Sequence, residues 1–206
     1  MIIGEYTGPL ALVYVTKPLT MVCIVTVALL GIRIVGGSRY GWLVVVALAL
    51  SMAGDVLLML PPDRFVQGLV VFLLAHLVYV AAFVESVGWR GSVRRLMIFL
   101  LFGLSIGWVL WSGLGGMRLP VAIYILVIMI MGWRAWERSI YIGDPGTRVA
   151  AIGALLFIIS DSILALNRFR EPFLAARALN LSAYFSAQWL FALSIRQQEP
   201  RTETSE

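Results

Sequence analysis

Charged residues are scarce in this sequence, and their scarcity excludes a typical soluble domain. Only 13% of the 206 residues are charged, while 61% are hydrophobic. About a quarter of an average soluble domain is charged. Many apolar runs are long enough to cross a bilayer, which takes about 20 helical residues. Because backbone exposed to lipid must satisfy its own hydrogen bonds, we expect these runs to be helices.

Cysteine and histidine are almost absent, which excludes a disulfide framework and the usual kind of zinc site. The chain has one cysteine, Cys23, and one histidine, His76, whereas structural zinc sites draw their ligands mainly from these two residue types. We therefore predict no metal and no cofactor. One alternative stays open, in which two aspartates and His76 hold another metal. The usual motifs for nucleophilic hydrolysis, phosphate binding and nucleic-acid binding are also missing from the sequence.

Seven apolar runs, separated by polar breaks, predict seven transmembrane helices. They cover about residues 10–34, 42–60, 65–87, 93–111, 119–136, 149–166 and 173–195. The breaks carry glycine and proline, which commonly end helices. We expect an all-α integral membrane protein, with a polytopic helical bundle at residues 1–196 and a disordered polar cytoplasmic tail at 197–206. Residues 1–7 lack the basic segment of a secretory signal, so we expect no cleavable leader.

The basic residues divide unevenly between the two ends of the bundle. Seven helices place the termini on opposite sides, and one side collects six basic residues while the other collects ten. The six are Lys17, Arg64, Arg118, Arg168, Arg170 and Arg177, and the ten are Arg33, Arg39, Arg90, Arg94, Arg95, Arg134, Arg138, Arg148, Arg196 and Arg201. Because positive residues favour the cytoplasm, we predict the N-terminus outside and the C-terminus inside, in a bacterial inner membrane. Topology and contact with anionic membrane lipids then account for the net charge of +5 without a nucleic-acid partner.

Two parts of the sequence resemble each other weakly. The segment Ser51-Met52-Ala53-Gly54-Asp55 is similar to Ile159-Ser160-Asp161, and each segment is followed by a helix that carries polar side chains. Spans one to three and five to seven would then be parallel repeats joined by the fourth span, a 3+1+3 plan. Chance likeness between apolar helices is the alternative explanation.

Two aspartates lie inside apolar runs, where an ionised carboxylate costs about 3 kcal/mol on insertion scales. Asp55 and Asp161 are the two of the eleven acidic residues that fall inside the predicted spans. Both lie in the outer third of helices that run in the same direction, so we expect them at similar depth, lining one cavity. The alternatives are a structural hydrogen bond between helices or an ion pair with Lys17.

Further polar side chains lie on these helices and their neighbours. They are Lys17, Ser51, His76, Tyr79, Arg168, Tyr184 and Gln188. Ser51 shares a helix face with Asp55, because residues four apart are neighbours on a helix. The candidate site thus combines acids, an imidazole, phenols, an amide and cations. Each has a structural alternative: packing for His76, extension to the membrane surface for Lys17, and helix–helix hydrogen bonding for the phenols and the amide.

The order of these motifs along the chain resembles one known family. The segments are Lys17-Pro18-Leu19, Ser51-x-x-Gly54-Asp55, Ala75-His76-x-x-Tyr79, Tyr124 with Arg134-Ala135, Ser160-Asp161 followed by Arg168-Phe169, and Tyr184-x-x-Ala187-Gln188. Each is weak alone, but six in this order are similar to the lysoplasmalogenase family of membrane proteins (YhhN-like). The resemblance runs from Lys17 to Ser194, nearly the whole chain.

This resemblance implies a hydrolase that cleaves the vinyl-ether bond of a lysoplasmalogen-type lysophospholipid to a fatty aldehyde and a glycerophospho-base. Such cleavage passes through an oxocarbenium ion, and glycosidases handle a related cation with one protonated and one ionised carboxyl. Asp55 and Asp161 would be this general acid/base pair, in roles left open, with His76 as a proton relay. The expected substrate-binding residues are Lys17, Ser51, Tyr79, Tyr124, Arg168, Tyr184 and Gln188, with Lys17 or Arg168 at the phosphate and Tyr79 and Gln188 at a water.

Two other functions fit the same polar residues. A bundle of parallel repeats with acids and a histidine at its centre also suits a proton-coupled small-molecule transporter. A membrane sensor is the third possibility, and it would need a partner to pass on its signal. A hydrolase releases aldehyde from lipid without any gradient, whereas a carrier releases no product.

Overall fold

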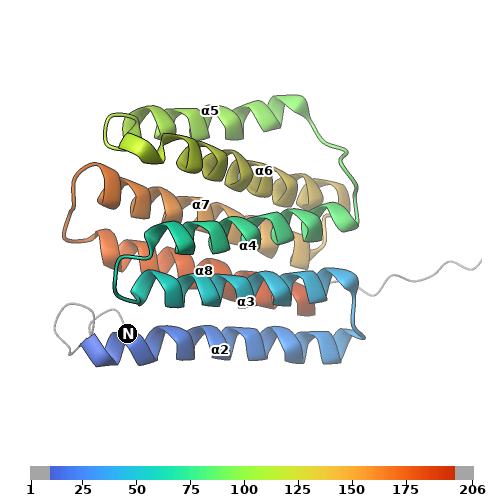
Figure 1. Cartoon of the computed structure of the whole chain (residues 1–206). Helices are drawn as coiled ribbons and strands as arrows, with labels where there is room; N and C mark the ends of the chain where they lie inside the picture. The colour runs from blue at the N-terminus through green and yellow to red at the C-terminus, as the bar shows by residue number, and fades with distance from the viewer. Residues whose placement is uncertain (1–9, 198–206) are drawn as a thin grey trace, which may run out of the picture.

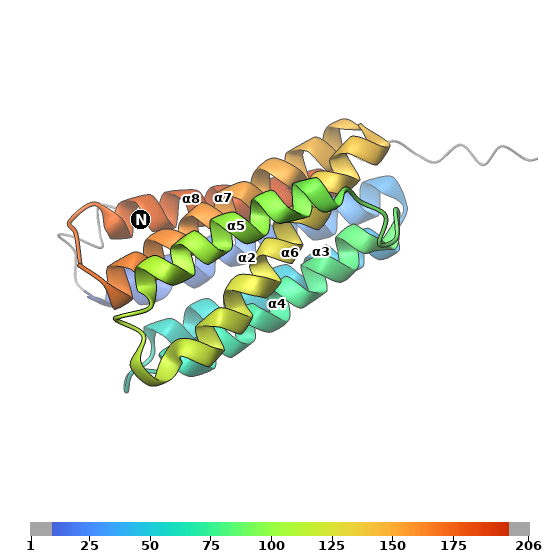
Figure 2. The same cartoon turned by 90° about the horizontal axis from the view of Figure 1, so that it is seen from above.

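The computed structural model describes residues 10–197, which form seven long helices. They are α2 (Leu10–Val35), α3 (Arg39–Met59), α4 (Phe65–Glu85), α5 (Val93–Leu110), α6 (Arg118–Ile142), α7 (Pro145–Phe169) and α8 (Ala176–Arg196), with a short 3-10 turn, η1 (Gly115–Met117), before α6. The helices lie side by side, and short connections at the two ends reverse the chain each time (Figure 1; Figure 2). No strand occurs between residues 10 and 197. The predicted all-α polytopic bundle is therefore confirmed.

Six of the seven helices are long and apolar enough, by length and composition, to cross a membrane. The seventh, α8, is as long as α3 and α4 but carries Arg177, Asn180 and Gln188. It packs along α7 and against α2, and its Gln188 side chain is fully buried in the protein. The protein is a multi-pass membrane protein. Apart from Gln197, the predicted tail lies outside the described residues.

The predicted helix ends are wrong at the junction of α6 and α7. The fifth predicted span ends at residue 136 and the sixth begins at residue 149. In the structure, α6 continues to Ile142 and α7 begins at Pro145. Gly143 ends α6 with a φ of 77°, a left-handed conformation that glycine adopts freely. Asp144 then starts α7, because its carboxylate accepts a hydrogen bond from the Thr147 backbone N–H at 2.6 Å.

Buried charges explain why α6 extends beyond its apolar stretch. Arg134 was counted above among the cytoplasmic arginines, yet its side chain is 0% exposed. It donates hydrogen bonds to the backbone carbonyls of Arg90 and Gly88, at 2.6 and 2.5 Å. Glu137 is also buried and pairs with Arg95 at 2.6 Å. These contacts fix the α4–α5 connection against α6. They also give Arg134 and Glu137 hydrogen-bond partners inside the protein, so this turn of α6 can be buried.

The packing of the helices follows the predicted 3+1+3 plan. α3 packs most extensively along α4, and α7 along α8; α2 contacts α3 and α8, just as α6 contacts α7 and α4. Each main contact among α2, α3 and α4 therefore has an equivalent among α6, α7 and α8, and the contact of α2 with α8 is matched by that of α6 with α4. The remaining helix, α5, joins the two halves and packs chiefly on α6. Because each helix reverses the one before it, equivalent helices four apart run in the same direction. This arrangement brings the equivalent helices α3 and α7 to the same pocket, described below.

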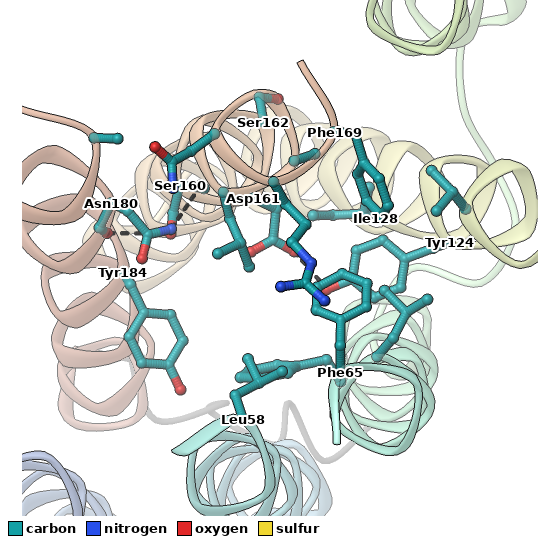
Figure 3. A pocket seen from close by; sticks show the side chains of 18 of the residues that line it. Leu58, Phe65, Tyr124, Ile128, Ser160, Asp161, Ser162, Phe169, Asn180 and Tyr184 are labelled. Atoms are coloured by element: carbon teal, nitrogen blue, oxygen red, sulfur yellow. Dashed lines mark hydrogen bonds between the residues drawn. The ribbon is translucent and has the colours of Figure 1, made fainter. Parts of the chain in front are cut away.

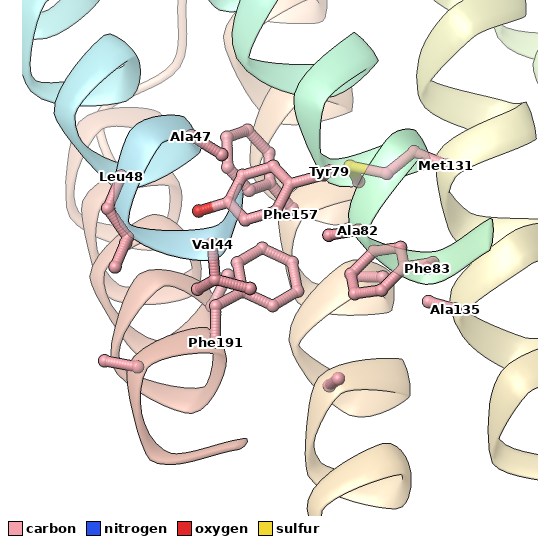
Figure 4. Close-up of a cluster of buried hydrophobic side chains, with 14 of the residues drawn as sticks. Val44, Ala47, Leu48, Tyr79, Ala82, Phe83, Met131, Ala135, Phe157 and Phe191 are labelled. Atoms are coloured by element: carbon pink, nitrogen blue, oxygen red, sulfur yellow. The ribbon is translucent and has the colours of Figure 1, made fainter. Parts of the chain in front are cut away.

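Aromatic rings fill the centre of the bundle below this pocket. Phe157 of α7 contacts the rings of Tyr79 and Phe191, with centroids 6.5 and 6.3 Å apart, and Tyr79 lies 4.4 Å from Phe191. Figure 4 shows these rings with Phe83 between α3, α4, α7 and α8. Large rings packed in this way contribute about 0.5–1.5 kcal/mol per pair beyond their buried area. They form a rigid floor for the polar residues above them.

The α5–α6 connection rests against the end of α7. A Cβ atom at Gly113 would lie 1.8 Å from the Phe169 carbonyl oxygen, whereas a Cβ at Gly116 would meet nothing within 4 Å. In the same contact, Arg170 donates to the Ser112 hydroxyl at 2.6 Å. This close approach fixes the ends of α5 and α7 relative to each other.

We expect Gly113→Ala to lower the free energy of unfolding by about 1–3 kcal/mol, because the new methyl group forces the backbone of two connections apart. Thermal unfolding of the purified protein in detergent measures the loss. Gly116→Ala is the matched control and should leave the midpoint unchanged. Equal midpoints for the two variants would show that the contact between Gly113 and Phe169 does not contribute to stability.

Candidate active site

A pocket of about 370 Å³ opens at the end of the bundle where α3, α5 and α7 end. Apolar side chains of α5 and α6 line one side, among them Ile106, Leu110, Ile125 and Met129. The other walls come from α2, α3, α4, α7 and α8. In Figure 3, Tyr184 and Tyr124 lie on opposite sides of the pocket. The cavity thus combines an apolar wall with a polar interior.

Two aspartates face this pocket, and each accepts a hydrogen bond from a tyrosine. The Tyr184 hydroxyl donates to Asp55 Oδ2 at 2.6 Å, which joins α8 to α3. The Tyr124 hydroxyl donates to Asp161 Oδ2 at 2.5 Å, which joins α6 to α7. The two carboxyls are close enough to interact electrostatically. The structure therefore places both aspartates at one cavity.

His76 lies behind Asp161 and is fully buried. Its Nε2 atom is 3.9 Å from Asp161 Oδ2, too far for a hydrogen bond. Neither ring nitrogen has a hydrogen-bond partner among the described residues that meets normal geometry. The imidazole packs edge-on against Tyr124 and Phe157, with ring centroids 5.1 and 4.8 Å apart. A small movement or one water would connect it to Asp161.

A second polar layer lies one helical turn below Asp55. Ser51, Tyr79 and Gln188 are each fully buried. The Tyr79 hydroxyl donates to Gln188 Oε1 at 2.8 Å. The Ser51 hydroxyl lies beside Tyr79, and the Gln188 amide lies beside Tyr184. Neither Ser51 Oγ nor Gln188 Nε2, however, has a partner within hydrogen-bond limits in the described part of the chain.

Charged side chains gather at the open end of the pocket. Lys17, Arg168 and Arg177 line it there with Asp63, and Lys17 interacts electrostatically with Asp55. Arg168 donates a hydrogen bond to Asp63 and lies over the Phe65 ring, 5.0 Å from its centroid. This guanidinium, helped by the Phe65 N–H, lowers the pKa of Asp63 below its ordinary value. The pair therefore remains ionic through the neutral pH range.

The structure brings together all ten residues predicted for the site. Six of them line the pocket, namely Lys17, Asp55, Tyr124, Asp161, Arg168 and Tyr184. The other four, Ser51, His76, Tyr79 and Gln188, are buried behind its wall. Among residues 10–197, no three His, Cys, Asp or Glu side chains are grouped so as to hold a metal ion.

Six polar residues that line the pocket were not predicted for the site, namely Asp63, Ser160, Ser162, Asn167, Arg177 and Asn180. Asp63 and Arg177 were treated as ordinary loop or topology charges, and only the fold places them at its open end. Asn180 was also missed, although its amide donates to the Ser160 carbonyl at 2.8 Å. Its position four residues before Tyr184, on the same helix face, was the signal that could have identified it.

We expect Tyr79→Phe to lower the free energy of unfolding by about 1–3 kcal/mol, because it leaves the buried Gln188 carbonyl without a donor. The double variant Tyr79→Phe/Gln188→Met should recover most of this loss, since it replaces both partners with apolar groups of similar size. Thermal unfolding of wild type, both single variants and the double variant gives the coupling between the two residues. Strictly additive losses would contradict a direct bond between them.

The model of the YhhN family matches residues 12–195 of the chain. Bovine lysoplasmalogenase TMEM86A is 36% identical over 161 residues, which cover 75% of this chain and 66% of that protein. Human lysoplasmalogenase TMEM86B is 38% identical over 158 residues, covering 76% and 65%. A protein of Escherichia coli O157:H7 named uncharacterized membrane protein YhhN is 27% identical over 192 residues, covering 93% and 91%.

The matched region spans slightly less than two thirds of the two mammalian relatives. No solved structure matches the chain significantly. The family match instead covers α2 to α8 almost completely, including every helix that contributes to the pocket and both aspartates inside it. On this evidence the chain belongs to the YhhN family.

Proposed function

We propose that the protein is a membrane-embedded hydrolase that cleaves the vinyl-ether bond of a lysoplasmalogen-type lysophospholipid. The observation that carries this proposal is the pair Asp55 and Asp161, which face one pocket from equivalent helices, each with its own tyrosine donor. Relatives more than a third identical are named lysoplasmalogenases, which supports the same activity for this chain. The products are a fatty aldehyde and a glycerophospho-base.

The reaction needs one carboxyl that gives a proton and one that takes a proton. The acid transfers its proton to the β-carbon of the vinyl ether, which leaves an oxocarbenium ion at the neighbouring carbon. Water adds to this carbon and loses a proton to the second carboxylate, giving a hemiacetal. The hemiacetal then collapses to the aldehyde and the free glycerol hydroxyl, and the proton returns to the acid. One water is consumed, and both carboxyls regain their starting states, as in the related chemistry of glycosidases.

The surroundings of the two aspartates support this division of protons. The carboxyls interact electrostatically across the pocket, where two negative charges near an apolar wall are unfavourable. A pair with one carboxyl protonated and the other ionised is therefore favoured. Each carboxyl also keeps one oxygen free of its tyrosine, since Tyr184 and Tyr124 bond the Oδ2 atoms. The free oxygens are available to substrate and water, and His76 is placed to exchange a proton with Asp161.

The pocket also suits an amphipathic lipid. The apolar wall of α5 and α6, with Ile106 and Met129, would take the alkenyl chain. Lys17, Arg168 and Arg177 at the open end would take the phosphate, because guanidinium groups bind phosphate oxygens through paired charge-assisted hydrogen bonds. The reactive bond of the lipid lies between its chain and its phosphate. It would then reach the aspartates from the membrane end that carries the head groups.

The proposed orientation follows from the charges at the two ends of the bundle. The pocket opens at the end with fewer basic residues, and the opposite end carries the larger group. By the preference of positive residues for the cytoplasm, the pocket would face the outer side of a bacterial inner membrane. Residues 1–196 would form the bundle, followed by a short polar tail in the cytoplasm.

Aldehyde release from a lysoplasmalogen by the purified protein in detergent is the direct test. We expect wild type to release aldehyde, and Asp55→Asn and Asp161→Asn each to lower kcat by at least about 100-fold, since each removes one member of an acid–base pair. Glu85→Gln, which removes an acid at the far end of α4, is the matched control and should retain activity. Thermal unfolding would show that the aspartate variants are folded.

A folded wild type that releases no aldehyde would contradict the hydrolase. The same protein in liposomes would then be assayed for proton-coupled flux, because a carrier needs two compartments and forms no product. Full activity in either aspartate variant would leave the hydrolase standing but contradict the two-carboxyl mechanism.

We expect Arg168→Gln to raise KM for a lysoplasmalogen about tenfold with little change in kcat, because one charge-assisted contact to phosphate is lost. A 1-alkenylglycerol, which carries the vinyl ether but no phosphate, is the matched substrate and should show no change in KM. If KM rises equally for both substrates, Arg168 shapes the pocket and does not bind the phosphate.

A further inference from the structure

We propose that the hydrolytic water binds one helical turn below Asp55, held by Ser51 and Gln188, and that Asp55 is therefore the base while Asp161 is the acid that protonates the β-carbon. This inference rests on the proposed hydrolase and adds the side from which water attacks and the role of each carboxyl. The basis is an asymmetry between two otherwise equivalent helices, α3 and α7.

The residues one turn below the two aspartates differ in kind. Ser51 lies four residues before Asp55, and Phe157 lies four residues before Asp161, so each shares a helix face with its aspartate. Both side chains are fully buried. Asp55 therefore stands above a hydroxyl, while Asp161 stands above an aromatic ring. In this layer, only the residue below Asp55 offers a hydroxyl to a water, whereas the polar group beside Asp161 is the imidazole of His76.

Unpartnered polar atoms mark the same place. Ser51 Oγ and Gln188 Nε2 are buried and lack a hydrogen-bond partner in the described part of the chain. Such atoms are rare in proteins, and buried ones are usually satisfied by a water that makes about three hydrogen bonds. Ser51 and Gln188 lie beside Tyr79 and Tyr184 respectively, and the Tyr79–Gln188 bond holds the amide in place. In the proposed site, the three partners of the water are these two groups and Asp55 Oδ1, the oxygen that Tyr184 leaves free.

The position of this water fits the order of the chemical steps. The lipid enters from the open end and covers the side of the aspartates that faces the pocket. A water bound one turn deeper, at the inner end of the pocket, stays in place when the lipid fills the pocket and remains next to the reacting carbon. After Asp161 gives its proton to the β-carbon, this water forms the new C–O bond and passes its proton to Asp55. The electron pair of the C=O⁺ bond moves to the ether oxygen, which gives the neutral hemiacetal.

The charges around each aspartate agree with this assignment. Lys17 acts electrostatically on Asp55. A nearby cation favours the carboxylate that must accept a proton from water. His76 Nε2 lies 3.9 Å from Asp161 Oδ2, so the imidazole is placed to return a proton to the acid after each cycle.

Trapping the cation with methanol tests the water site. An oxocarbenium ion captured by methanol gives a mixed acetal in place of aldehyde, and mass spectrometry gives the ratio of the two products. Ser51→Ala should lower kcat about tenfold with KM within about twofold, because the water loses one of its three partners. It should also raise the acetal-to-aldehyde ratio at least about fivefold, since the methyl group of methanol fits where the hydroxyl was removed.

Ser105→Ala, the same change on the lipid-facing side of α5, is the control and should match wild type. A purely structural Ser51 would leave the product ratio unchanged. Unchanged kcat and product ratio in Ser51→Ala, with aldehyde still released by wild type, would overturn the water site and leave the hydrolase intact. Absence of aldehyde from wild type would instead overturn the hydrolase.

Rescue by azide tests the roles of the two aspartates. Azide needs no base to attack the cation, so it should restore substrate turnover to Asp55→Ala, with an azido ether as the product. It should not restore Asp161→Ala, which cannot form the cation. Rescue of Asp161→Ala alone would reverse the assignment, and rescue of neither variant would contradict a base role for Asp55. Thermal unfolding of both variants establishes that they are folded.

Discussion

Two hydrogen bonds from phenols to carboxylates govern the centre of this bundle. Asp55 and Asp161 lie in apolar helices, and an unpaired carboxylate there would be costly. The Tyr184–Asp55 bond removes that cost and ties α8 to α3, while the Tyr124–Asp161 bond ties α6 to α7. Each bond thus satisfies a functional group and fixes the angle between two helices. The pocket lies between these two hydrogen bonds, because each tyrosine holds its aspartate on its own side of the pocket.

At the opposite end of the bundle, buried charged residues have structural partners. There Arg134 is buried with backbone carbonyls as partners, and Glu137 is buried with Arg95. These contacts hold the α4–α5 connection and extend α6, and nothing about them requires a substrate. Polar groups inside a membrane protein can therefore be structural or functional, and burial alone does not separate the two. The distinction is that the aspartates face a cavity, whereas Arg134 faces backbone carbonyls and Glu137 faces Arg95.

Hydropathy determined most of the fold in advance, because each apolar run must become a helix in lipid. The same reasoning failed at residues 137–142 and 145–148, where polar residues read as a loop are helical. Glu137, just beyond the predicted end of the span, is paired with Arg95, 42 positions away in the sequence, and no local pattern reveals such a partner. The candidate site divides in the same way. Asp55 and Asp161 were recognisable because acids are rare in apolar runs, but Asp63 and Arg177 joined the site only through the packing of the chain ends.

The two similar halves of the bundle, α2–α4 and α6–α8, bear on how Asp55 and Asp161 could have different chemical roles. If α2–α4 and α6–α8 were identical, the pocket would hold two equivalent carboxyls, and either could give or take the proton. The packing keeps the helices equivalent, so the carboxyls arrive at the same pocket with matching tyrosine donors. The inequality comes from what lies one turn below, where Ser51 stands in one half and Phe157 in the other. A hydroxyl can hold water and a phenyl ring cannot, so under the proposed mechanism this one difference in the layer below would make Asp55 the partner of water and Asp161 the partner of carbon.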